Sequence, residues 1–194
     1  MSIIIAYKKN GIVYMGADTQ TTSGDYKYNS LRTERIKITV INNILVGSAG
    51  NVSLINIAKA QLSLIDIPND LVLTKRFIVE AIVSKLHKNQ VEKDKLTDND
   101  LSESFGYSLI LAKDNNLFII ESDGSVREIG NWVAIGLRAE TLTPLYRNIE
   151  MSASDIILKG LNHVANIDES VSKPYITCKT DTLNIIIHDL EGAL

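Results

Sequence analysis

The sequence predicts an α+β fold in which two antiparallel sheets face each other and helices cover their outer sides. Apolar residues recur at the two-residue period of strands at both ends and in the middle of the chain, and at the helical period in between. The order is strands, two helices, strands, two helices and strands. Strands grouped apart from helices favour antiparallel sheets over a parallel βαβ arrangement. So many apolar strands are covered best by two facing sheets with helices outside.

Strands fill the first fifty residues. Residues 3–7 and 12–17 flank Asn10-Gly11, a dipeptide typical of two-residue hairpin turns. Residues 36–40 alternate between apolar and polar types, and residues 44–46 continue as a buried strand. We therefore expect two consecutive hairpins.

Two amphipathic helices are expected next. Apolar residues at helical spacing predict a helix over 54–65, before Pro68, and a second over 73–88. The charged and polar stretch 91–104 is interpreted as a solvated loop.

The second half of the chain repeats this order. Helices are expected over 139–149 and 154–167, the latter opened by Ser152 with Asp155 three residues on, a weak capping box. The expected strands are residues 107–112, 117–121, 126–129, 132–136, 175–179 and 183–188.

Composition narrows the class of protein. The 194 residues, 45% hydrophobic and 22% charged, suit one domain spanning 1–194 with a large core, which excludes dominant disorder. A net charge of −3 without a basic cluster argues against nucleic acid, and no apolar run reaches the roughly 18 residues of a membrane span. The single cysteine, Cys178, excludes an internal disulfide and a multi-cysteine metal site. With no secretory signal recognised, a cytoplasmic location is expected.

Conventional catalytic motifs are absent, but the start of the chain offers a nucleophile. The sequence has no G-x-S-x-G, phosphate-loop, H-E-x-x-H or C-x-x-C motif, and its three histidines and Cys178 are interpreted as structural. Removal of Met1 would give Ser2 a free α-amine, with an ordinary pKa of about 7.7–8.0, beside its hydroxyl. Nucleophile and base would then occupy one residue. The alternative is that Met1-Ser2 simply begins a strand.

Two further features fit this chemistry. Asp18 ends the second strand, where hairpin pairing brings it close to the start of the first. The segment Gly47–Gly50 lies between a buried strand and a helix, so its backbone N–H groups could stabilise an oxyanion.

Taken in order, these segments resemble the proteasome β-subunits and HslV, a bacterial proteasome-like peptidase. The resemblance covers nearly the whole chain and is most specific in the first fifty residues. It rests on residues 2–7, 11–24, 35–36, 44–50, 107–112, 123–126, 132–136 and 151–156. It implies the N-terminal-nucleophile (Ntn) hydrolase fold, a four-layer αββα sandwich.

The resemblance also implies roles for single residues. Ser2 stands where the family has its nucleophilic threonine, Asp18 matches a structural acid, and Gly50 matches the glycine whose N–H binds the oxyanion. The family's catalytic lysine aligns with Arg35 if one residue is inserted, and otherwise with Glu34. Arginine cannot shuttle a proton, but Arg35 would lower the α-amine pKa by repulsion and pair with Asp18.

Substrate contacts are implied along the same edge. Thr22 matches the threonine whose strand binds substrate backbone, with Thr21 as the alternative one residue away. Ser48 is assigned to substrate binding with them.

The late part of the family's site is matched less well. The family's Gly-Ser-Gly-Gly segment corresponds to 136–139 here, which lacks its serine hydroxyl. The late acid is assigned to Asp168, with Asn166 competing for the position. The late serine is assigned to Ser170 or Ser172.

The functional expectation is a proteasome-like peptidase with Ser2 as nucleophile, requiring no metal or organic cofactor. The resemblance implies stacked homo-oligomeric rings, a peptide or unfolded-protein substrate and an AAA+ ATPase unfoldase as partner. Two alternatives stay open: a ring or scaffold subunit that has lost activity, and a small-molecule amidase of the same superfamily.

Overall fold

The strands form two five-stranded antiparallel sheets and one small hairpin. The computed structural model describes residues 2–23, 26–29, 36–88, 104–147 and 150–188. The first sheet contains β1 (Ile3–Lys9), β2 (Ile12–Asp18), β10 (Trp132–Gly136), β11 (Tyr175–Lys179) and β12 (Ile186–His188), in the order β10-β1-β2-β11-β12. The second contains β5 (Ile38–Ile41), β6 (Ile44–Gly50), β7 (Tyr107–Lys113), β8 (Asn116–Ile120) and β9 (Val126–Glu128), in that order. The hairpin pairs β3 (Gln20–Ser23) with β4 (Tyr26–Asn29).

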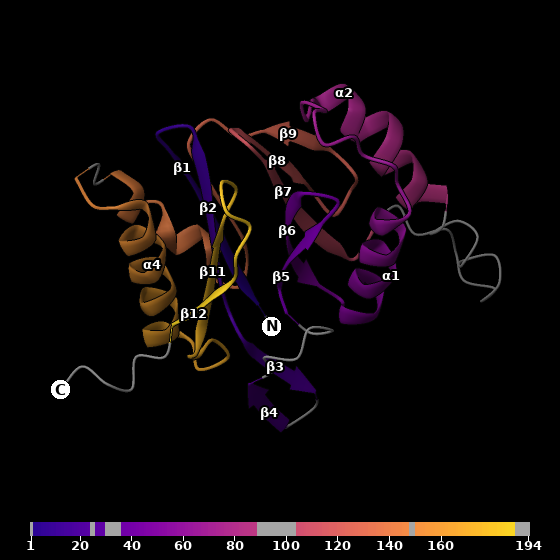
Figure 1. Cartoon of the computed structure of the whole chain (residues 1–194). Helices are drawn as coiled ribbons and strands as arrows, with labels where there is room; N and C mark the ends of the chain where they lie inside the picture. The colour runs from indigo at the N-terminus through magenta and orange to yellow at the C-terminus, as the bar shows by residue number, and fades with distance from the viewer. Residues whose placement is uncertain (1, 24–25, 30–35, 89–103, 148–149, 189–194) are drawn as a thin grey trace.

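Helices cover the outer face of each sheet, which gives four layers (Figure 1). The first sheet is covered by α4 (Ala153–Ile167) and the 3₁₀ turns η3 (Ala139–Leu142) and η4 (Leu145–Arg147). The second is covered by α1 (Val52–Ser63), α2 (Lys75–Phe77), the π-helical η2 (Ile78–Val83) and helical turns at 84–88. The predicted α+β sandwich of two antiparallel sheets flanked by helices is therefore confirmed. None of the helices in the described ranges is both long and apolar enough to cross a membrane.

Local sequence signals explain the turns and helix starts. Asn10 and Gly11 both have positive φ, 52° and 78°, as the turn between β1 and β2 requires. Asn51 caps α1 by accepting hydrogen bonds from two backbone N–H groups of its first turn. Ser152 caps α4, accepting from the N–H of Asp155 at 3.1 Å, as the sequence predicts.

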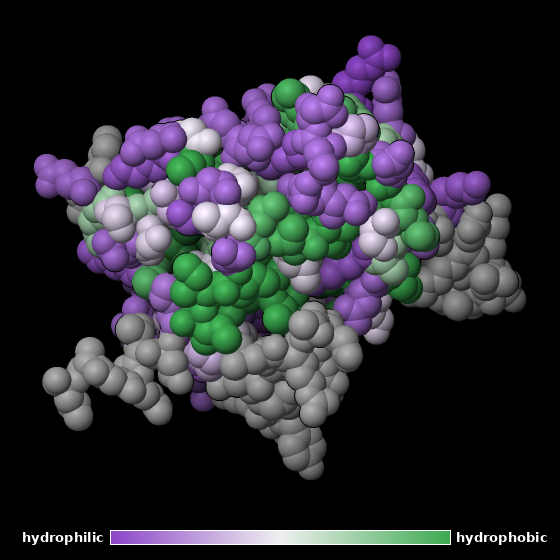
Figure 2. Space-filling view, viewed as in Figure 1, coloured by the Kyte–Doolittle hydropathy of each residue, from purple (hydrophilic) through white to green (hydrophobic). Residues whose placement is uncertain are grey.

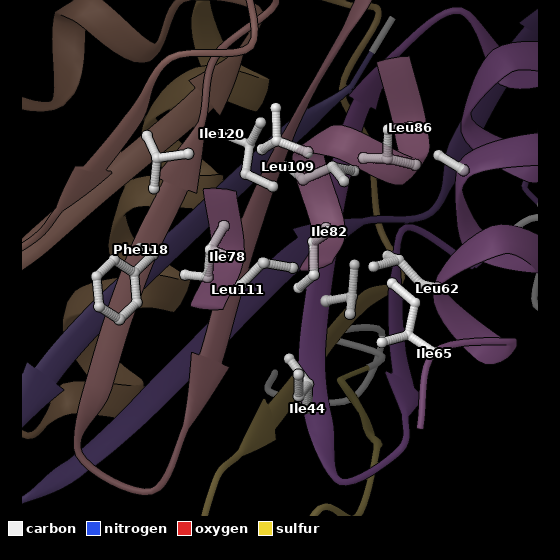
Figure 3. Close-up of a cluster of buried hydrophobic side chains, with 14 of the residues drawn as sticks. Ile44, Leu62, Ile65, Ile78, Ile82, Leu86, Leu109, Leu111, Phe118 and Ile120 are labelled. Atoms are coloured by element: carbon white, nitrogen blue, oxygen red, sulfur yellow. The ribbon is translucent and has the colours of Figure 1, made fainter. Parts of the chain in front are cut away.

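The core occupies all three spaces between the layers. Alternation along β1 places Ile3 and Ile5 against α4, and Ile4 and Ala6 against the second sheet. This burial on both faces explains why β1 is apolar throughout. Figure 3 shows the third space, where side chains of the second sheet meet those of the covering helices. The labelled residues are Ile44, Leu62, Ile65, Ile78, Ile82, Leu86, Leu109, Leu111, Phe118 and Ile120.

Three predicted elements need correction. The helix expected over 139–149 is the two short turns η3 and η4, because Pro144 lies between them and cannot continue a helix. The strand expected over 36–40 begins only at Ile38. The strand expected over 183–188 begins at Ile186, after Leu183 takes a positive φ of 55°.

The loop predicted over 91–104 cannot be compared with the structure. Most of the expected loop 91–104 lies outside the described residues.

Strand β12 is an edge of the first sheet, and its apolar side chains are half exposed. In Figure 2, apolar side chains form a patch on the face where β12 lies in Figure 1. The residues concerned are Ile185, Ile186 and Ile187.

Candidate active site

The peptide unit between Ser2 and Ile3 is held at both of its polar atoms. The Ser2 carbonyl accepts a hydrogen bond of 2.7 Å from the N–H of Leu137, just past β10. The Ile3 N–H donates to Oδ1 of Asp18 at 3.0 Å, at the end of β2. A Cβ on Gly136 would lie 2.0 Å from the Ser2 carbonyl oxygen, so only glycine allows this close approach. The backbone of Ser2 is therefore fixed between β2 and β10.

Asp18 also forms an ion pair that joins the two sheets. Its Oδ2 lies 2.6 Å from Nζ of Lys37, which precedes β5 of the second sheet. Both side chains are buried, Asp18 completely and Lys37 to 7% exposure. One carboxylate thus contacts the backbone beside Ser2 with one oxygen and a buried ammonium with the other.

Burial and charge act in opposite directions on this pair. Desolvation raises the pKa of Asp18, while the positive charge and hydrogen bond of Lys37 act to lower it. Desolvation likewise lowers the pKa of Lys37, opposed by the charge of Asp18. A lysine whose pKa is lowered can exchange a proton more readily than an exposed one, and an arginine cannot.

Lys37 is not among the site residues predicted from the sequence. The family's catalytic lysine was aligned with Arg35 or Glu34, both of which lie outside the described residues. Lys37 occupies a bend before β5, where its carbonyl accepts from the N–H of Ser48 at 3.0 Å and from the Ser48 hydroxyl at 3.3 Å. The usable signal was a lysine directly before a buried strand.

Strand β6 brings the predicted oxyanion segment to the same edge. Ala49 is a direct neighbour of Gly136, because a Cβ on Gly136 would lie 3.4 Å from the Ala49 Cβ. Gly50 follows with a φ of +134°, and a Cβ there would lie 2.5 Å from the Gly106 carbonyl oxygen. Helix α1 then begins at Val52. Gly50 is thus the last residue of β6, the strand whose Ala49 lies beside Gly136, and it directly precedes the N-terminal cap of α1.

The residues assigned to substrate binding lie on two strands. Thr21 and Thr22 are in β3, paired with Tyr28 and Lys27 of β4. Ser48 is buried in β6, and its hydroxyl donates a hydrogen bond to the Lys37 carbonyl. The side chain of Ser48 thus contacts the backbone of Lys37.

Asp168 and Ser170, the residues predicted for the late part of the site, are connected through Arg138 to the backbone that binds Ser2. Asp168 follows α4, and its Oδ1 accepts from the Ser170 N–H at 3.0 Å. This hydrogen bond is the main reason that the pKa of Asp168 is lowered. Its Oδ2 lies 3.4 Å from Nε of Arg138, the neighbour of Leu137. The Leu137 side chain packs with the α4 core.

Other candidate groups have structural surroundings. His87 packs against the ring of Phe105, and Nε2 of His188 lies 2.7 Å from the Thr177 hydroxyl. Cys178 is a buried core residue, where desolvation raises the pKa of its thiol. Within the described ranges, no three His, Cys, Asp or Glu side chains are grouped as a metal site would require.

Comparison by sequence finds no relative. No protein-family model matches the chain, and no curated protein sequence matches it.

Solved structures are similar over nearly the whole chain. BPH from Thiobacillus denitrificans has a TM-score of 0.73 and 19% identity, over 97% of this chain and all of that one. Anbu, an ancestral β-subunit from Yersinia bercovieri, has a TM-score of 0.70 and 15% identity, over 97% and 88%. Eukaryotic HslV from Trypanosoma brucei has a TM-score of 0.62 and 20% identity, over 91% and 98%. At these identities the likeness establishes the fold: the chain has the four-layer αββα architecture of proteasome-like Ntn proteins.

Proposed function

We propose that this protein is a proteasome-like peptidase whose nucleophile is Ser2, exposed as the first residue by removal of Met1. The Ser2 Oγ attacks the carbonyl carbon of a peptide bond, and its proton passes to the Ser2 α-amine. The oxyanion of the tetrahedral intermediate is held by the Gly50 N–H. The proton then passes to the leaving amine, and water hydrolyses the resulting ester.

In this proposal, Lys37 takes the role that the family resemblance implied for Arg35. Its positive charge near the α-amine favours the neutral amine, which is the form that can accept the serine proton. Asp18 holds Lys37 with one oxygen and the Ile3 N–H with the other, at 2.6 and 3.0 Å. The two contacts of Asp18, with the Lys37 ammonium and with the Ile3 N–H, are together the observation on which the proposal rests.

One solved relative supports the chemistry by analogy. The similar BPH structure from Thiobacillus denitrificans is also known in complex with epoxomicin, with a TM-score of 0.71 and 18% identity to this chain. This likeness supports a hydrolase function for this chain, in line with the proposal.

Peptide turnover by the natively expressed protein tests the proposal. Wild type should release product from a fluorogenic peptide set, and Ser2→Ala should lower kcat by at least about a thousandfold, because the alanine has no attacking oxygen. Ser2→Thr should retain turnover, since it keeps both hydroxyl and amine. The matched control is Ser63→Ala, at the exposed end of α1. Turnover equal in wild type and Ser2→Ala would overturn the proposal.

A subunit without activity is the second candidate. Leu137 favours it, because this position offers only a backbone N–H to Ser2 and directs its side chain into the core. That candidate predicts no turnover of any peptide, whether or not Met1 is removed. Hydrolysis of small amides but not of peptides would instead indicate an amidase.

We further propose that the protein acts as a homo-oligomeric, stacked ring served by an AAA+ unfoldase. The proposal rests on the resemblance of its sequence to the proteasome β-subunits and HslV. The half-exposed isoleucines of the edge strand β12 are compatible with self-association, because an apolar edge of a sheet is usually covered by another part of the chain or by another chain. Light scattering of the purified protein tests it: a monomer at micromolar concentration would contradict a stable ring.

A further inference from the structure

A second lysine contacts the segment that presents Lys37. Lys59 lies in α1, and its Nζ donates a hydrogen bond of 2.8 Å to the Ile36 carbonyl. This contact spans 23 residues of sequence and joins a helix to the residue directly before Lys37. Ile36 itself packs against the core between the two sheets.

The backbone around Lys37 is consequently fixed from two sides. Lys59 holds the carbonyl of Ile36, and Ser48 of β6 holds the carbonyl of Lys37 with its N–H and its hydroxyl. A peptide plane is rigid, so two successive anchored carbonyls leave the residue between them little freedom. The direction in which the Lys37 side chain leaves the backbone is therefore set by these contacts.

We propose that Lys59 is a positioning residue, which holds the Ile36 carbonyl and thereby keeps the Lys37 ammonium against Asp18. The inference rests on the proposed function for its catalytic consequence. Its structural part, the position of Lys37 relative to Asp18, holds independently of that function.

The surroundings of Lys59 fit this role better than a general contribution to stability. Burial lowers the pKa of Lys59 to about 8, and in the described part of the chain no carboxylate lies in ion-pair contact with it. A mostly buried ammonium held by a single carbonyl costs more to desolvate than a solvated one. Lys85 also donates to a backbone carbonyl, that of Leu64 at 3.2 Å, but this hydrogen bond is exposed to solvent at the end of α1. Lys85 is thus a matched control.

The test measures Asp18 and turnover separately. The Asp18 carboxyl is titrated by carbon-13 NMR in wild type, Lys59→Met, Lys59→Arg and Lys85→Met, and kcat and KM are measured on the same proteins. In Lys59→Met the Asp18 midpoint should rise, because Lys37 no longer offsets the burial of Asp18 fully. Its kcat should fall about tenfold with KM changed less than about twofold. Lys59→Arg, which keeps a charged donor, should restore both values, and Lys85→Met should match wild type.

Each result decides the inference. An Asp18 midpoint unchanged in Lys59→Met overturns it, even if kcat falls. A midpoint raised equally by Lys85→Met also overturns it, because the effect would then be unspecific. If wild type shows no Ser2-dependent turnover, the proposed function fails, and the Asp18 titration alone decides the role of Lys59. If Lys59→Met does not fold, Lys59→Gln takes its place in the same titration.

Discussion

A buried lysine lies near each end of strand β6, but the two lysines face different partners. At the Gly50 end, Lys37 contacts the fully buried carboxylate of Asp18. At the Ile44 end, Lys113 of the neighbouring β7 donates to the carbonyls of Asn69 and Leu71, at 2.9 and 2.8 Å. The carboxylate beside Lys113, that of Asp114, is 68% exposed.

This difference separates a structural cation from a candidate catalytic one. Lys113 ties a loop to the sheet through neutral oxygens, and water can screen its contact with Asp114. Lys37 and Asp18 are both removed from water, so removing Lys37 would leave the Asp18 carboxylate buried without its cation. Burial of a lysine alone therefore says little about its role, whereas the group that its ammonium faces says much more.

Substitution of Lys37 should have the largest effect. Lys37→Met should abolish Ser2-dependent turnover and lower the free energy of unfolding by about 3–5 kcal/mol, because Asp18 is left buried without its cation. Urea denaturation and peptide hydrolysis measure the two effects. Full turnover in Lys37→Met would remove the distinction between the two ends of β6.

Gly136, the last residue of β10, and Gly130, which precedes this strand, together test whether the position of Ser2 matters. Gly136→Ala should lower turnover about a hundredfold, because the new Cβ would meet the Ser2 carbonyl oxygen at 2.0 Å and displace it. Gly130→Ala is the matched control, since a Cβ there has no atom within 4 Å. Similar kinetics in both variants would show that displacement of Ser2 has no consequence.

Lys113 should affect stability without affecting catalysis. Lys113→Met keeps the apolar stem but removes the donor to Asn69 and Leu71, which should lower the free energy of unfolding by about 1–3 kcal/mol. The kcat of the folded variant should equal that of wild type. A loss of turnover in the folded protein would make Lys113 more than a structural cation.

The smallest expected effect concerns Lys59 and alkaline pH. Its pKa is about 8 in the folded chain against 10.5 ordinarily, so between these values the unfolded chain binds more protons. The free energy of unfolding should therefore rise with pH across this window, by about 1 kcal/mol after allowance for partial exposure to solvent. Lys59→Met should lack this rise. Parallel pH profiles of stability for the two proteins would contradict the assignment.

The fold could be predicted from the sequence because its signals are local. Alternating apolar residues, the Asn10-Gly11 turn and the Ser152 cap each act over a few positions, and the structure has these elements. The helix expected over 139–149 was wrong where a single local signal, Pro144, was passed over. An error of this kind changes one predicted helix but leaves the four-layer fold class unchanged.

The candidate site could be predicted only in part, because its contacts are distant in sequence. Asp18 was identified from hairpin pairing, and it does contact the backbone next to Ser2. Lys37 reaches Asp18 across the gap between two sheets, and no periodicity encodes that contact. The number of residues between β2 and β5 does not fix which of several neighbouring side chains arrives there. The link from Asp168 through Arg138 to Leu137 is also a tertiary contact, between residues 30 positions apart.

The most direct test of Ser2 as the nucleophile is the intact mass of the natively expressed protein before and after reaction with an electrophilic peptide probe. The account predicts a chain that lacks Met1 and gains one probe adduct, which is absent in Ser2→Ala and present in Ser63→Ala. A chain that retains Met1, or an adduct that persists in Ser2→Ala, would contradict it.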